Sequence, residues 1–110
     1  MKLNEYQEKA SSFAIYPDKH KIVYSALGLV GESGEVAGKI RKWLRGDDGE
    51  GGINDSRKEA IKDELGDVLW FLALTARDLD LNLEDIAQSN ILKIQSRKER
   101  GTIMGDGDKR

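Results

Sequence analysis

Apolar residues recur at spacings of three and four along most of the chain, the spacing at which side chains share one face of an α-helix. The pattern gives little support to strands, which would alternate with a period of two. It predicts four helices, at residues 3–15, 18–44, 56–79 and from residue 82 to about residue 100. We therefore expect an all-α protein.

The ends of these helices carry recognisable signals. Pro17 ends the first helix, because proline lacks the N–H that a helix interior needs. Ser56 and Glu59 have the spacing of a capping box and predict the start of the third helix. Asn82 is expected to cap the fourth helix, and Gly101 is expected to end it.

Two segments lack a helical pattern. Residues 45–56 are charged and rich in glycine, which predicts a mobile loop, and residues 102–110 form a C-terminal tail. The second helix is unusual because it carries glycines at positions 28, 31, 34 and 38. Each costs up to ~1 kcal/mol relative to alanine in a helix interior. Close contact with another helix or with a ligand would explain them.

Composition narrows the possible chemistry. A length of 110 residues suits one domain with a modest core, so we treat residues 1–110 as a single domain. With no cysteine and one histidine, the chain has no thiolate nucleophile and no multi-histidine metal site, which leaves oxygen ligands for any metal. The net charge of −2 argues against a broad basic surface for nucleic acid. Neither a signal peptide nor a run of ~20 apolar residues is present, which predicts a cytoplasmic protein without membrane contact.

Two similar acidic motifs stand out. Glu32 and Glu35 lie three residues apart on the second helix, and Glu64 and Asp67 lie three apart on the third, with a glycine before the second acid of each pair. This spacing puts both carboxylates of a pair on one helix face. If the two helices pack antiparallel, all four carboxylates can face a common space, and such oxygen ligands suit Mg²⁺ or Mn²⁺.

The acids lack local partners. No basic residue stands three or four positions from Glu32 or Glu64, and Asp67 follows two other acids, so like charges crowd the patch. Ordinary solvated acids are the alternative interpretation, and for a single motif it would be preferred. Two motifs on adjacent helices favour a metal site. A di-iron carboxylate bundle needs Glu-x-x-His units, which the isolated His20 does not supply.

Three segments resemble the MazG family of nucleoside triphosphate pyrophosphohydrolases. They are NEYQEKA in the first helix, GLVGESGEVAGKIRK in the second and ELGDVLWFLA in the third, and the resemblance spans nearly the whole chain. It implies a four-helix bundle-like fold, assembled as a dimer or a dimer of dimers. It also implies that Mg²⁺, with Mn²⁺ as a substitute, is held by four carboxylates and carries the triphosphate; these are Glu32, Glu35, Glu64 and Asp67. Gly31 stands where the family often has another glutamate.

The resemblance extends to the fourth helix. There Asn90, Lys93 and Arg97 follow one another on one polar face, and donors of this kind neutralise phosphate oxygens that a metal leaves free. We interpret them as substrate contacts, with an ordinary solvated face as an equally weighted alternative. Asp108 and Arg110 in the tail resemble a family ending that closes over a site, either in the same chain or in a neighbouring subunit.

The implied reaction is Mg²⁺-dependent hydrolysis of nucleoside or deoxynucleoside triphosphates to the monophosphate and pyrophosphate, by attack of water on the α-phosphorus. Glu32 or Glu35 is expected to act as the general base. The alternatives are a pyrimidine-specific hydrolase acting on dUTP or dCTP, and a non-catalytic helical module that binds a partner.

Aromatic and amide side chains that could contact a base are left out of this candidate site. Tryptophan at helical spacing is more often part of a core or a subunit interface. The residues concerned are Tyr6, Gln7, Trp43 and Trp70.

Overall fold

All regular structure in the chain is helical. The computed structural model describes residues 1–110, and its elements are α1 (Leu3–Ser11), the short 3-10 helix η1 (Asp18–His20), α2 (Val23–Leu44), α3 (Asp55–Asp78) and α4 (Leu83–Glu99). The all-α class and the four main helices are confirmed. No helix is long and apolar enough to cross a membrane.

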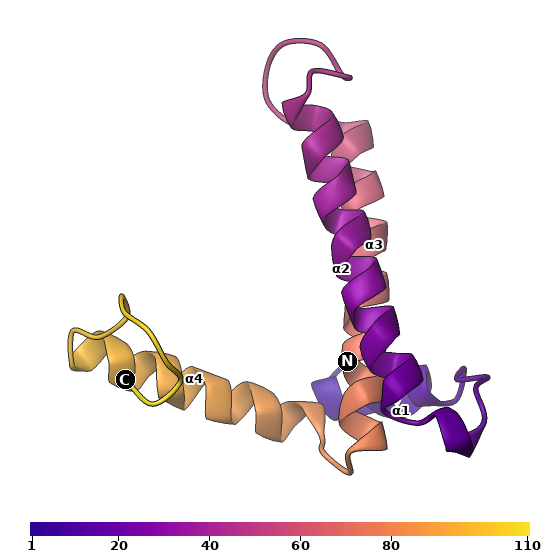
Figure 1. Ribbon diagram of the computed structural model, residues 1–110, viewed down its shortest axis with the longest axis vertical. Helices are drawn as coiled ribbons and strands as arrows, with labels where there is room; N and C mark the ends of the chain where they lie inside the picture. The colour runs from indigo at the N-terminus through magenta and orange to yellow at the C-terminus, as the bar shows by residue number, and fades with distance from the viewer.

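The helices form an L-shaped molecule (Figure 1). α2 and α3 pack along their lengths as an antiparallel hairpin, which is by far the most extensive helix contact. α1 packs against the end of α3 that lies away from the hairpin loop, and it also contacts α4. α4 then extends away from the hairpin, and the radius of gyration is 17.0 Å.

Close packing of the hairpin explains one of the glycines. A Cβ atom at Gly28 would collide with the ring of Phe71 on α3, so only glycine fits at this crossing. Added Cβ atoms at Gly31, Gly34 and Gly38 would meet nothing within 4 Å. The expectation of close helix contact is therefore confirmed for Gly28, whereas the other three lie on an open face of α2.

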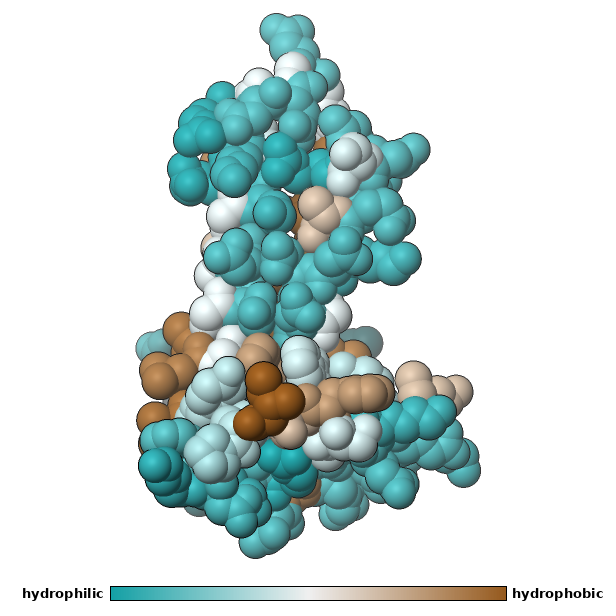
Figure 2. Space-filling view, turned by 90° about the vertical axis from the view of Figure 1, so that its right-hand side faces the viewer, coloured by the Kyte–Doolittle hydropathy of each residue, from teal (hydrophilic) through white to brown (hydrophobic).

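The buried core is small and sits where α1, α3 and α4 meet. Only eight of 110 residues are buried, and the apolar ones are Ala10, Ala73, Leu74, Ala76 and Leu83. Large apolar side chains remain exposed on α2 and α4; they include Val23, Leu27, Val30, Ile91, Leu92 and Ile94. On the face drawn in Figure 2, hydrophobic patches lie in the lower half of the molecule, below a hydrophilic hairpin tip. Much apolar surface is thus left uncovered within one chain.

Gln7 is a polar member of the core. Its amide nitrogen donates to the carbonyl oxygens of Leu81 at 2.9 Å and Ala73 at 3.3 Å, and its amide oxygen accepts from the backbone N–H of Leu83 at 3.0 Å. These bonds satisfy backbone groups at the corner between α3 and α4. Gln7 therefore holds the fold together and is not available to contact a base.

The connection between α1 and α2 differs from the expectation. α1 ends at Ser11 rather than at Ile15, and α2 begins at Val23 rather than near Asp18. Ile22 interrupts the helix because its φ of 70° lies in the left-handed region, which L-residues other than glycine rarely adopt. A periodic apolar pattern cannot reveal such a break, because the tertiary contact that stabilises it comes from α3.

The capping box predicted at Ser56 and Glu59 is wrong. α3 begins at Asp55, and its N-cap is Asn54, two residues before Ser56; the Asn54 side-chain oxygen accepts from the backbone N–H of Arg57 at 2.7 Å. Arg57 also pairs with Asp48 in the loop at 2.8 Å, which holds the start of α3 against the loop. The caps of α4 are confirmed: the Asn82 side chain accepts from the backbone N–H of Asp85, and Gly101 follows the helix with φ of 69°.

Residues 45–54 and the tail contain turns but no helix or strand, so the loop is two residues shorter than expected. Within the loop, Arg45 pairs with Asp47 at 2.7 Å. The tail folds back on the end of α4, where the Arg110 side chain donates to backbone carbonyl oxygens of residues 102, 103 and 107. Mobility of the loop stays a prediction.

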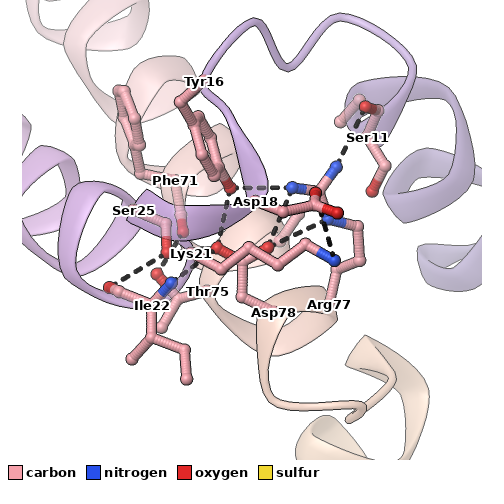
Figure 3. Close-up of polar contacts among 12 residues, drawn as sticks. Ser11, Tyr16, Asp18, Lys21, Ile22, Ser25, Phe71, Thr75, Arg77 and Asp78 are labelled. Atoms are coloured by element: carbon pink, nitrogen blue, oxygen red, sulfur yellow. Dashed lines mark hydrogen bonds and ion pairs between the residues drawn. The ribbon is translucent and has the colours of Figure 1, made fainter.

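Asp78, at the end of α3, holds the strained connection in place (Figure 3). One carboxylate oxygen accepts from the backbone N–H of Ile22 at 3.0 Å, from Ser25 at 2.9 Å and from Tyr16 at 2.8 Å, while the other pairs with Arg77. Burial alone would raise the pKa of Asp78, but the hydrogen bonds from these four residues outweigh it and lower the pKa to about 2.

Asp78→Asn should lower the free energy of unfolding at neutral pH by about 2 kcal/mol, because the charged acceptor is lost. A carboxyl whose pKa falls from 3.8 to about 2 on folding contributes fully above pH 3.8 and loses this contribution as the pH falls toward 2. Urea unfolding at several pH values should therefore show the gap between wild type and variant narrowing over that interval. Asp106→Asn, in the exposed tail, is the control and should unfold like wild type; a gap of constant size would contradict the assignment.

Candidate metal centre

The hairpin brings acidic side chains from both of its helices together. One carboxylate oxygen each from Glu32 on α2 and from Glu64 and Asp67 on α3 lies within 4.8 Å of the others. Glu32 and Glu64 are half-buried and Asp67 is exposed. We call these three residues the carboxylate group.

Glu35 lies outside the carboxylate group. It is exposed on α2, three residues beyond Glu32. Its negative charge still contributes to raising the pKa of Glu32. The structure therefore groups three of the four acids singled out from the sequence and leaves the fourth beside them.

Electrostatic repulsion within the group is visible in the pKa of Glu32. Burial raises this pKa first, and the negative charges of Asp67, Glu64 and Glu35 raise it further. Each effect disfavours the ionised form of Glu32. A positive charge placed among these oxygens would reverse the effect of the neighbouring acids.

One such charge is already present, and the sequence reasoning missed it. The Lys39 ammonium lies 3.6 Å from a carboxylate oxygen of Glu64, across the hairpin. Spacings of three and four along one helix do not reveal this pair, because Lys39 lies on α2 and Glu64 on α3. A signal existed, because Lys39 stands seven positions after Glu32 and therefore lies ~20° from it around α2.

The donor set fits a divalent cation. Three carboxylates supply only oxygen ligands, which Mg²⁺ and Mn²⁺ prefer. Adjacent oxygens around an octahedral Mg²⁺ lie about 3 Å apart and opposite ones about 4.2 Å, so the three side chains would have to draw closer than 4.8 Å to bind one ion together.

An aromatic cleft adjoins the carboxylate group. It has a volume of about 450 Å³, and Asp67 is part of its wall. Tyr6 and Phe13 from the N-terminal region and Trp70 from α3 supply aromatic surface. Burial and the charge of Asp67 raise the pKa of Tyr6, in agreement with this proximity. Tyr6 and Trp70, which the sequence reasoning left out of the site, therefore line a cleft at its edge.

The residues expected to contact substrate lie elsewhere in the chain. Asn90 and Lys93 are exposed along α4, where both line a groove with Leu81 in the connection between α3 and α4. Arg97 is buried further along α4. Because α4 extends away from the hairpin, the structure of a single chain does not bring these three residues to the carboxylate group (Figure 1).

The C-terminal tail contacts Lys93 and Arg97, two basic residues of α4. The Arg97 guanidinium donates to the backbone oxygen of Asp108 at 2.7 Å, and the Asp108 carboxylate lies 3.8 Å from Arg97 and 3.9 Å from Lys93. Asp108 and Arg110 thus rest on their own α4 rather than on the carboxylate group.

The family described as MazG nucleotide pyrophosphohydrolase domain matches residues 24–102, well over half of the chain. The chain belongs to this family. The matched residues include α2, α3 and α4 of the MazG domain, together with every acid of the carboxylate group, while α1 lies before them.

A relative of this MazG protein is the Gene 37 protein of Mycobacterium phage L5. The two are 43% identical over an alignment that covers the whole of both chains. No solved structure matches the chain. Membership of the MazG family supports nucleotide pyrophosphohydrolase activity in general terms.

Proposed function

We propose that this MazG protein is a Mg²⁺-dependent hydrolase that splits nucleoside triphosphates into the monophosphate and pyrophosphate, with water attacking the α-phosphorus. The observation that carries the proposal is the convergence of Glu32, Glu64 and Asp67 from two helices within 4.8 Å. Negative charge is concentrated there, and a divalent cation is a partner of the opposite charge that can also bind the triphosphate.

Glu32, Glu64 and Asp67 would hold the cation, with Glu35 completing the set from its position beside Glu32. A divalent cation supplies neutralisation of phosphate oxygens and a lowered pKa for water. The side chains then have to position the α-phosphorus and take a proton from the attacking water. We assign the proton to Glu32 or Glu35, because a carboxylate that holds the cation through one oxygen can accept a proton on the other.

The aromatic cleft would receive the nucleobase. Tyr6, Phe13 and Trp70 offer faces for stacking, and the cleft meets the carboxylate group at Asp67. A triphosphate held at the acids would therefore have its base beside these rings. Few polar side chains line the cleft, which favours a broad choice of bases over a pyrimidine-specific site.

Assembly would complete the site. Basic residues on α4 that could bind further phosphate oxygens lie remote from the acids, and large apolar residues on α2 and α4 stay exposed. A symmetric dimer, or a dimer of dimers, covers such surfaces and lets α4 of one protomer supply Lys93 and Asn90 to the acids of its partner. We propose this arrangement for the active protein.

Pyrophosphate release tests the activity directly. A panel of ribo- and deoxynucleoside triphosphates, dUTP and dCTP included, should give pyrophosphate only when Mg²⁺ or Mn²⁺ is present. Glu64→Gln should lower kcat/KM by about 100-fold, because a charged carboxylate ligand is replaced by a neutral amide of the same shape. Glu50→Gln, in the exposed loop, is the matched control and should keep full activity.

Circular dichroism should show equal helix content in all three proteins. Equal release with and without divalent cations would contradict a metal-dependent mechanism. If folded wild type released no pyrophosphate from any nucleotide, the result would favour a non-catalytic binding module.

Mixing two inactive variants tests whether partners share a site. Glu64→Gln removes an acid and Lys93→Met removes a cation, and each alone should be impaired. When the two are co-refolded in equal amounts, we expect about a quarter of wild-type activity, because half of the dimers are mixed and each holds one intact site. Activity no higher than that of the separate variants would place both residues in the site of one chain.

A further inference from the structure

Lys39 is the one basic side chain that pairs with the carboxylate group, and its surroundings differ from those of other lysines. Its ammonium lies 3.6 Å from Glu64, and the exposed fractions of the two side chains are 26% and 19%. The comparable lysine–glutamate pair on α3, Lys62 with Glu59, has exposed fractions of 75% and 69%. Solvent screens a surface pair strongly and a partly buried pair less. Solvent therefore screens the attraction between Lys39 and Glu64 less than it screens the attraction between Lys62 and Glu59.

The position of Lys39 also makes it a competitor for a cation. It stands two helical turns beyond Glu32 on nearly the same face of α2, and it reaches back to Glu64 on α3. Two positive charges at one carboxylate repel each other. A divalent cation that takes both oxygens of Glu64 must therefore displace the ammonium or bind more weakly because of it.

The ammonium of a displaced Lys39 can reorient toward a new partner. Lysine carries its charge on a flexible four-carbon stem with three donors, so it can reorient while its backbone stays fixed in α2. Phosphate oxygens arriving with the cation are the nearest new negative charges, and lysine binds phosphate as a point charge.

We propose that Lys39 is an exchangeable counter-ion: it pairs with Glu64 when no divalent cation is bound, and it contacts a phosphate oxygen of the nucleotide once the cation has taken Glu64. Only the contact between Lys39 and a phosphate oxygen rests on the proposed function. The proposal assigns a role to a residue that lies outside the acidic motifs and outside the polar face of α4.

Removal of the charge should act in opposite directions on the two ligands. In Lys39→Met, Mn²⁺ alone, measured by electron paramagnetic resonance of the free ion without nucleotide, should bind about tenfold tighter because a competing charge is gone. A non-hydrolysable triphosphate with an α,β-methylene bridge, measured by calorimetry at saturating Mn²⁺, should bind about tenfold weaker because a phosphate contact is lost.

Two further variants define the comparison. Lys62→Met removes a lysine of the same hairpin from a solvent-exposed pair, and it should leave both affinities unchanged. Lys39→Arg keeps the charge, and its Mn²⁺ affinity should stay close to that of wild type. Lys39→Gln replaces Lys39→Met if the latter shows reduced helix content by circular dichroism.

A merely structural pair predicts a different result. If Lys39 only held Glu64 in place, Mn²⁺ and the nucleotide would both bind more weakly to Lys39→Met, and this would overturn the proposal, as would two unchanged affinities. A wild type that releases no pyrophosphate but binds Mn²⁺ tighter after Lys39→Met would refute the proposed function and retain the counter-ion role toward the metal.

Discussion

Repulsion among the carboxylates between α2 and α3 is the constraint on which the rest of the structure depends. Oxygens of Glu32, Glu64 and Asp67 lie within 4.8 Å of one another. Burial of Glu32 raises its pKa, and the negative charges of Asp67 and Glu64 raise it further. Hairpin packing enforces this approach, because Gly28 lets α2 lie directly against Phe71. One lysine, Lys39, pairs with an acid of this group, Glu64. Such an arrangement costs stability in the free protein and becomes favourable when a cation enters, which is what a binding centre requires.

A second constraint is the size of the core. Eight buried residues are few for a chain of 110, so the helices share little apolar core. Hydrogen bonds of Gln7 and Asp78 therefore link segments that are far apart in the sequence. α4 leaves the hairpin with leucine and isoleucine side chains exposed, and it also carries cations that suit phosphate. Assembly would address both features at once, by covering apolar surface and by supplying positive charge to a partner's acids.

Local patterns predicted most of the fold, and long-range contacts account for what they missed. Helical periodicity and the signals at Asn82 and Gly101 located the helices because both act within a few residues. The break at Ile22 depends on Asp78, more than fifty positions away, and the pairing of Lys39 with Glu64 crosses from one helix to another. Spacing predicted which acids share a face, but it did not show that Glu35 stands outside the group or that the tail covers Arg97.

In the proposed reaction, this carboxylate group directs water to the α-phosphorus of a nucleoside triphosphate. The most direct test is hydrolysis in water enriched in heavy oxygen, followed by mass spectrometry of both products. Attack at the α-phosphorus predicts one heavy oxygen in the nucleoside monophosphate and none in the pyrophosphate. Heavy oxygen in the pyrophosphate, or release of orthophosphate instead of pyrophosphate, would show attack at another phosphorus and contradict the proposed mechanism.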